Sequence, residues 1–202
     1  MKNILVLLLI QLALTACSAV KIPVSNQYTL NAYSAKTLAR HDAHLSILVS
    51  QPEALAGYQT EQMHYIQKPF ELSTFANNSW ISPPATMLYP LILQSLQKTR
   101  FFHAVASGPY ADKADYRLDT QVMMLQQNFL IKPSAIDLVV KITLTHISDN
   151  RLVASRMISE HVPCPSDNPY GGVIAANEAS KALTSTLSQF VISQIKQDDI
   201  NK

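Results

Sequence analysis

Residues 136–158, IDLVVKITLTHISDNRLVASRMI, determine the fold class of this 202-residue chain. Apolar side chains alternate with polar ones over residues 136–144, and a second strand-like run covers residues 152–158. Between them lies Ser148-Asp149-Asn150, and Asp and Asn favour turns because their side chains hydrogen-bond to nearby backbone. A period of two on both sides of such a turn predicts a β-hairpin with one buried face.

More strands are expected on the N-terminal side of this hairpin. Residues 116–124 alternate in the same way, so they should extend the hairpin into a three-stranded meander. The apolar run at residues 45–49 predicts a compact strand. Residues 63–75 predict one or two strands with a break or an edge at Pro69, and residues 101–106 predict another strand.

Two helices complete the predicted elements. Ser82-Pro83 suggests an N-cap hydroxyl followed by a proline at the first helical position, and leucines at helical spacing follow to about Lys98. Asn168-Pro169 should begin a long final helix with one apolar stripe. Because most strands have one polar face, both helices are expected to cover the other face. The prediction is an α+β, two-layer domain with a largely antiparallel or mixed sheet and two main helices packed on one face.

The first sixteen residues have the features of a signal peptide. Lys2 supplies a positive charge, and the apolar run that follows is too short to span a bilayer. Leu14-Thr15-Ala16-Cys17 resembles a lipobox, which implies cleavage before Cys17, diacylglycerol on its sulfur and an acyl chain on its new amine. The alternative is an ordinary secretory signal that is cut after Ala16. The predicted segments are a signal peptide at 1–16, a lipidated N-terminus and tether at 17–44, and a folded domain at 45–202.

The tether and its first residue predict where the protein lies. Tyr28-Thr29-Leu30 could pair as a short strand, and the rest of the tether reads as a linker. Bacterial lipoproteins are commonly retained in the inner membrane by an aspartate after the lipidated cysteine, and here that position is Ser18. We therefore expect a lipid anchor in the outer membrane and a domain that faces the periplasm.

Composition and motifs argue against several functions. The formal net charge is only +2 and no long basic run occurs, so nucleic acid is not an expected partner. With Cys17 lipidated, Cys164 has no partner for a disulfide within the chain.

No catalytic or metal-binding motif is present. His41 and His44 with Asp42 form a weak metal site without a fourth ligand. Asp115 and Asp119 would lie over ~12 Å apart on a strand, too far to work as an acid/base pair. No catalytic residue, metal or cofactor is expected apart from the lipid on Cys17, so the protein should not be an enzyme.

An ordered set of short motifs resembles one known family. These motifs are Tyr28-Thr29-Leu30, the 45–49 strand leading to Gln51-Pro52-Glu53-Ala54-Leu55, Met63-His64-Tyr65, Trp80-Ile81-Ser82-Pro83, Phe101-Phe102-His103-Ala104-Val105, Ala114-Asp115-Tyr116-Arg117-Leu118, the Asp-Asn hairpin and the Ala-rich last helix. Together they resemble the ABC-type transport auxiliary lipoprotein family, of which PqiC is the best-known type.

The resemblance implies a binding role without a reaction. Such lipoproteins accompany an ABC transporter and an MCE-domain protein in lipid transport between membranes, so the expected partner is the MCE-domain protein, with self-association left open. Tyr58, Phe70 and Phe75 are candidate interface residues, although each could also simply close the core. Two alternatives remain, namely an outer-membrane lipoprotein that regulates envelope assembly enzymes and, less consistent with the motifs, a tethered hydrolase.

Overall fold

The computed structural model describes residues 25–39, 44–108 and 113–200 of the chain. The signal peptide, Cys17 and His41 lie outside the described residues. In chain order the elements are β1 (Asn26–Tyr28), β2 (Ser46–Val49), β3 (Glu53–Ala54), the short 3-10 helix η1 (Ala56–Tyr58), β4 (Gln62–Lys68), β5 (Glu71–Trp80), α2 (Pro84–Lys98), β6 (Ala104–Ser107), β7 (Tyr116–Asn128), β8 (Ala135–His146), β9 (Arg151–Pro163) and α3 (Pro169–Ile200).

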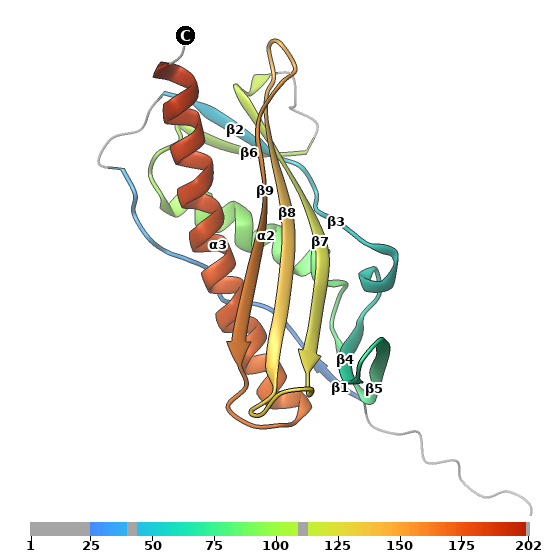
Figure 1. Ribbon diagram of the computed structural model, residues 1–202. Coiled ribbons are helices and arrows are strands. Elements are labelled where there is room, and N and C mark those ends of the chain that lie inside the picture. Colours follow the sequence, from blue (N-terminus) through green and yellow to red (C-terminus); the bar gives the residue numbers. More distant parts are fainter. Residues whose placement is uncertain (1–24, 40–43, 109–112, 201–202) are drawn as a thin grey trace, which may run out of the picture.

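The predicted meander is confirmed. β7, β8 and β9 are long antiparallel neighbours, and they run side by side down the molecule in Figure 1. Leu118 pairs with Leu144, and both side chains are fully buried, because alternation puts every second residue on the face that meets the helices. The turn after β8 lies where Ser148-Asp149-Asn150 predicted it, with Asn150 at φ 53.

The other side of β7 carries three short strands in succession. β2, β3 and β4 all pair in parallel with β7, opposite residues 116–118, 121–122 and 126–128 respectively. β4 then forms a hairpin with β5, β1 adds to β5 in parallel, and β6 adds to β2 in parallel. The described strands therefore form one mixed sheet of nine strands, curled into a half-barrel.

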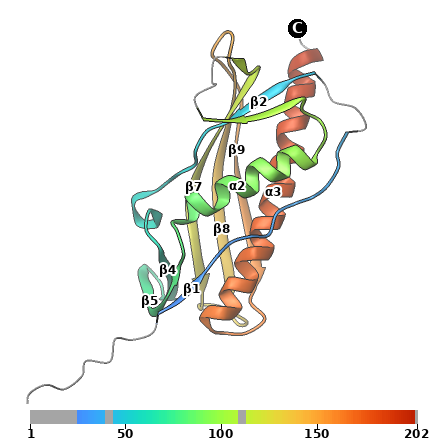
Figure 2. The ribbon, with the colours of Figure 1, turned by 180° about the vertical axis from the view of Figure 1, so that it is seen from behind.

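Both helices cover the same face of the sheet, as predicted (Figure 2). α3 packs along β8 and β9, and α2 crosses between α3 and β7. The core between these layers is aliphatic and includes Leu88, Ile92, Leu138, Leu183 and Leu187, all nearly or fully buried. Burial of each such side chain contributes about 1.5–3 kcal/mol to stability, so this layer contact is the main stabilising element.

The start of α2 differs from the prediction. The helix begins at Pro84, its N-cap is Pro83 with φ −51 and ψ 142, and no side chain caps it. The expected cap at Ser82 is wrong because a residue that precedes proline is driven out of the helical region, and Pro83 precedes Pro84. Pro90 lies inside the helix.

The segment expected to be a tether is folded over residues 26–39. β1 forms at Asn26–Tyr28, Leu30 is buried, and the backbone amides of Leu38 and Ala39 donate to the carbonyl of Thr99. The linker prediction is therefore wrong for this part of the chain. Its contacts are to residues distant in sequence, which a local pattern does not reveal.

Two further strand predictions are refined. The region 63–75 forms two strands, β4 and β5, and Pro69-Phe70 is the turn between the paired residues Lys68 and Glu71. The strand expected at 101–106 begins at Ala104, because Phe101 and Phe102 instead insert their side chains into the core.

Candidate functional site

The loops at one end of the domain bring together segments that are far apart in sequence. The β4–β5 turn, the β7–β8 loop and the start of α3 all lie toward the lower end of the molecule in Figure 1, where β1 also begins. Their nearness follows from strand direction, since β4 and β7 are parallel and both run toward this end.

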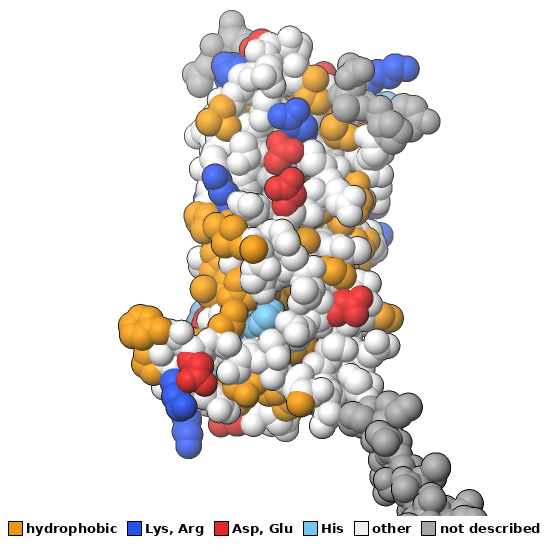
Figure 3. Space-filling model, turned by 90° about the vertical axis from the view of Figure 1, so that its right-hand side faces the viewer, with side chains coloured by type: hydrophobic (Ala, Val, Ile, Leu, Met, Phe, Trp, Pro, Cys, Tyr) orange, Lys and Arg blue, Asp and Glu red, His pale blue; other side chains and the backbone are white. Residues whose placement is uncertain are grey.

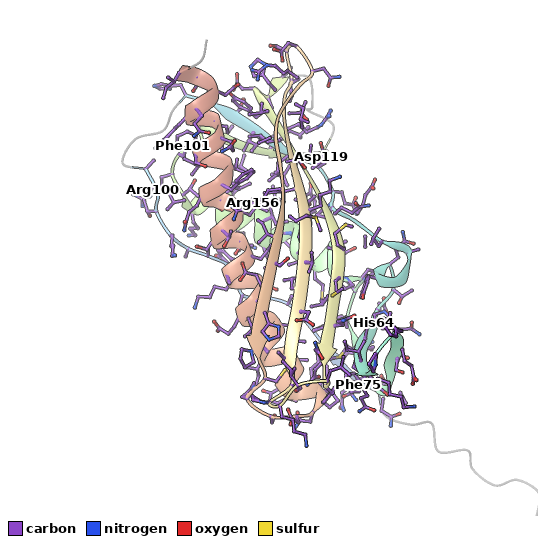
Figure 4. The ribbon with its side chains drawn as sticks, viewed as in Figure 1. His64, Phe75, Arg100, Phe101, Asp119 and Arg156 are labelled. Atoms are coloured by element: carbon purple, nitrogen blue, oxygen red, sulfur yellow. The ribbon has the colours of Figure 1, made fainter. Side chains whose placement is uncertain are left out.

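An aromatic cluster joins the β4–β5 hairpin to the β7–β8 loop. The ring centroids of Tyr65 and Phe75 are 4.5 Å apart, and Phe129 lies 5.9 Å from Tyr65 and 6.3 Å from Phe75. Edge-to-face and tilted pairs at these distances contribute about 0.5–1.5 kcal/mol each beyond the area they bury. Phe75 is labelled in Figure 4, near His64 at the lower end of the sheet. It is half-buried in this cluster rather than freely exposed.

Tyr58 is buried and does not belong to an exposed interface. Its hydroxyl donates a hydrogen bond of 2.8 Å to Oε1 of Gln126, and its ring meets His64 edge-on at 5.2 Å. Burial raises the pKa of Tyr58, with a further contribution from the negative charge of Asp137. Burial also lowers the pKa of His64, partly offset by the backbone of Gly57. The expectation that Tyr58 contributes to a binding surface is therefore wrong, and its role is to close the core.

Phe70 is fully exposed at the tip of the β4–β5 turn. Its backbone adopts φ 67, a left-handed conformation that glycine normally supplies at this turn position. On either side Lys68 and Glu71 form an exposed ion pair of 3.5 Å. Of the three aromatic residues expected at an interface, Phe70 alone has a free ring.

Other exposed apolar side chains share this end of the molecule with Phe70. Leu130 and Ile131 are exposed in the β7–β8 loop, and Tyr170 and Ile174 are exposed one turn apart at the start of α3. The ring of Tyr170 lies 6.1 Å from that of Tyr28, which places the start of α3 beside β1. We call this set the basal surface, and it comprises Phe70, Leu72, Leu130, Ile131, Tyr170 and Ile174. Figure 3 shows hydrophobic side chains gathered over the lower half of one face, with some projecting from its outline.

The interior next to the aromatic cluster is too small for a lipid. The cavity lined by His64, Phe75, Trp80 and Gln126 has a volume of about 10 Å³. That is about the space for one water molecule, whereas ligand pockets usually measure about 300–1,000 Å³. An acyl chain therefore does not fit inside this part of the described fold.

A polar cleft of about 290 Å³ lies beside β7, between the part that pairs with β2 and the part that pairs with β3. Asp119, which is labelled in Figure 4, lines this cleft with Glu53 and Lys141. Its carboxylate is 3.0 Å from Nε of Arg117. Asp115 accepts hydrogen bonds from the amide and the hydroxyl of Ser46, at 2.7 and 2.6 Å. Each of the two carboxylates thus has its own structural partner.

The remaining candidate residues form no metal site in the described structure. No group of three or more His, Cys, Asp or Glu side chains that could hold an ion occurs within residues 25–39, 44–108 and 113–200. The ring of His44 lies 6.5 Å from that of His103. Cys164 is a free, buried thiol, as predicted, and burial raises its pKa.

The family model for the ABC-type transport auxiliary lipoprotein component matches residues 28–188. The chain is a member of this family. The match begins at Tyr28, in the strand that packs onto the domain, and ends within α3. The family is described as a lipoprotein component of ABC-type transport, so the chain is an auxiliary transport lipoprotein of the cell envelope.

Solved structures show that the fold is shared by proteins with very different sequences. Protein XCC0632 from Xanthomonas campestris is 22% identical, with a TM-score of 0.79 over 87% of this chain and 99% of that protein. An uncharacterized protein of known structure is 15% identical, with a TM-score of 0.67 over 83% of this chain and 99% of that one. At these identities the likeness concerns the fold alone. No curated protein sequence gives a significant match.

Phe70 was a candidate interface residue from the sequence, whereas the other residues of the basal surface were not. Leu130 and Ile131 are adjacent apolar residues just before Pro133, so their place in a loop was a usable signal. Tyr170 follows the helix-initiating Pro169 and was indistinguishable from a core residue of α3. The gathering of these residues depends on parallel pairing between β4 and β7, which local sequence does not show.

Proposed function

We propose that the mature protein is acylated on Cys17 and anchored in the outer membrane, with its domain in the periplasm. There it docks the MCE-domain protein of an ABC-type lipid transport system. It catalyses no reaction in this role. The family match over residues 28–188 carries this proposal, and the lipobox Leu14-Thr15-Ala16-Cys17 supports it. Ser18 after the lipobox favours the outer membrane over retention in the inner membrane. No helix in the described part of the chain is long and apolar enough to cross a membrane.

The face of the meander that no helix covers is the best candidate for the surface that binds the partner. Both helices lie on the opposite face (Figure 2), and the side of β8 and β9 without a helix faces the viewer in Figure 1. Met157 is exposed there and is paired in register with the exposed Lys141, and the hydroxyls of Thr143 and Ser155 lie 3.3 Å apart beside them. An apolar residue ringed by polar ones is the usual composition of a protein interface.

Acylation is tested by changing the cysteine. Cys17→Ala should abolish lipid attachment and leave an uncleaved or soluble form that no longer partitions into detergent. The control is Cys164→Ala, which alters the buried thiol and should leave processing intact. Normal maturation and membrane retention of Cys17→Ala would refute the lipobox interpretation. Fractionation with inner-membrane markers would refute the outer-membrane assignment.

Docking is tested by co-purification with the MCE-domain protein encoded beside this gene. We expect the wild-type chain to retain it, and Met157→Glu on the uncovered face to lose it. Tyr170→Ser, at the end of the domain away from this face, serves as the control and should still bind. If the wild-type pair fails to associate and deletion of the gene leaves detergent tolerance unchanged, the envelope-assembly regulator becomes the better hypothesis. Light scattering of the purified protein measures whether it self-associates.

A further inference from the structure

We propose that the basal surface lies against the membrane, so that the domain is held by its lipid and also by Phe70 and its apolar neighbours in the headgroup region. This inference takes its orientation from the proposed acylation of Cys17. The occupant of the surface is thus a phospholipid bilayer.

The covalent path to the anchor places this end of the domain near the bilayer. Only eight residue steps separate Cys17 from Ser25, where the described structure begins. At 3.3–3.6 Å per residue that path measures at most about 26–29 Å. β1 starts at Asn26 beside β5, at the end of the molecule that carries the basal surface (Figure 1). Wherever the lipid is inserted, it keeps this end of the domain within about 26–29 Å of the membrane.

Residues 29–34, which follow β1, are hydrogen-bonded to α3 and keep that end of the domain close to the anchor. Nδ2 and Oδ1 of Asn177 bond to the backbone of Thr29, Asn31 and Ala32 at 2.8–3.2 Å. The amide of Ser34 donates to Oγ1 of Thr184 at 2.9 Å. The chain therefore cannot lengthen its tether without breaking hydrogen bonds to α3, of which the one from Ser34 to Thr184 is buried.

The side chain of Phe70 is fully exposed, so it does not stabilise the fold by packing in the core. A non-glycine residue at φ 67 also raises the energy of the backbone. A glycine or asparagine would relieve the turn, whereas phenylalanine adds only an apolar ring that faces outward. Insertion of that ring among lipid headgroups would remove it from water, whereas the folded protein alone leaves it in water.

The charges around the basal surface suit a phospholipid interface. Lys68 and Lys132 flank the turn and the loop, where Lys68 pairs with the exposed Glu71 at 3.5 Å and the charge of Lys132 helps to lower the pKa of Asp167. An apolar ring beside lysines is a composition found at membrane–water boundaries. Nearby carboxylates have partners within the protein. Asp167 accepts from the amide of Ser134 at 2.6 Å, and Asp137 lies 2.6 Å from Nδ1 of His161. These paired carboxylates therefore repel lipid phosphate groups less than unpaired carboxylates would.

The test places an environment-sensitive fluorophore on single cysteines of the mature, acylated protein. Phe70→Cys and Leu130→Cys report on the basal surface, and Leu152→Cys, exposed at the β8–β9 turn, is the matched control at the opposite end. Cys164 is 4% exposed and its pKa is raised, so it competes poorly for the label, and the sulfur of Cys17 is taken up by the lipid. The vesicles contain phosphatidylethanolamine, phosphatidylglycerol and a nitroxide-labelled lipid as quencher.

We expect labels at residues 70 and 130 to shift to shorter wavelength and lose most of their fluorescence to the quencher, and the label at 152 to be unaffected. Equal, unquenched emission at all three positions overturns the inference. Disulfide cross-linking between residues 70 of two copies, or protection of residue 70 only when the MCE-domain protein is added, would overturn it in favour of a protein interface.

A second arrangement separates this inference from the proposed acylation. The mature chain with Cys17→Ser and an N-terminal polyhistidine tag is held on the same vesicles by a nickel-chelating lipid. Quenching at residue 70 is expected here too, and Phe70→Ser with a label at residue 130 should show a smaller quenched fraction than the unsubstituted turn. If Cys17 proves not to be acylated, quenching at residue 70 still supports membrane contact and its absence still refutes it.

Discussion

The hydroxyl of Tyr116 donates a hydrogen bond of 3.0 Å to Asp198, so the first residue of β7 is joined to the last turns of α3. Asp198 is also bound by Nη2 of Arg151 from the start of β9, at 2.7 Å from its other oxygen. Burial is the main cause that raises the pKa of Tyr116, and its bond to Asp198 adds to it. The end of the domain opposite the basal surface is therefore closed by polar contacts.

Tyr116→Phe is expected to lower the free energy of unfolding by about 1.5 kcal/mol, because a hydrogen bond to a charged acceptor is lost while Arg151 still pairs Asp198. Urea unfolding measures the difference. Tyr170→Phe removes the same hydroxyl from an exposed ring and should change stability by less than about 0.5 kcal/mol. Equal effects of the two substitutions would contradict a role for the Asp198 bond.

Asn177→Ala should release the segment that leads to the proposed lipid anchor. Oδ1 of the Asn177 side chain accepts hydrogen bonds from the backbone N–H groups of Asn31 and Ala32, and because water can reach these groups, its loss should cost about 0.5–1.5 kcal/mol. Hydrogen exchange of these two amides should become faster while that of β8 is unchanged. Glu178→Ala is the control, since its side chain only forms an exposed 3.9 Å contact with Lys181. Unaltered exchange at Asn31 would show that the segment is held by other contacts.

Gly171→Ala should destabilise the domain by about 1–3 kcal/mol, since an added methyl group would collide with the backbone carbonyl of Ser166. The backbone there is fixed by the bond from the amide of Gly171 to Oδ1 of Asn168, at 2.8 Å. Gly57→Ala is a matched change with no atom within 4 Å of the new carbon, and it should be neutral or slightly stabilising. Thermal unfolding of the two variants distinguishes a steric effect from a general effect of losing glycine.

Stability should depend on pH through Asp149. Its pKa is lowered from 3.8 to about 2, chiefly by the hydrogen bond to His146, with the backbone amide of Arg151 also contributing. A folded-state pKa below the unfolded value stabilises the fold above pH 3.8, and that contribution is lost as pH falls toward 2. Asp149→Asn keeps the shape of the turn and removes the titrating group. The melting-temperature difference between wild type and Asp149→Asn should thus shrink between these pH values, and a constant difference would contradict the assignment.

The sequence predicted the elements whose pattern is local. Alternation in β7, β8 and β9 and the helical spacing in α2 and α3 were sufficient, because one buried face imposes a period on each element. It suggested a short strand at Tyr28-Thr29-Leu30, close to β1, but it did not predict that the following residues pack onto the domain, since that segment is held by Asn177, far away in sequence. It also did not show that Tyr58 is buried with its hydroxyl hydrogen-bonded to Gln126. Such contacts depend on which strands become neighbours, and parallel pairing leaves no turn signal between them.

The arrangement of short strands along β7 has a consequence for biogenesis. Ile47 pairs with Tyr116 and His64 pairs with Gln126, so β2 and β4 complete their hydrogen bonding only against residues made much later. Contacts of such large sequence separation close slowly, because the loop entropy is lost before the contacts form. In the proposed export, which proceeds N-terminus first, the β4–β5 hairpin and the β2–β6 pair can form early, but no strand joins these two parts of the sheet until residues 116–128 follow. During that interval one edge of β2 and one edge of β4 have no partner strand, and we expect periplasmic chaperones to bind the exposed segments.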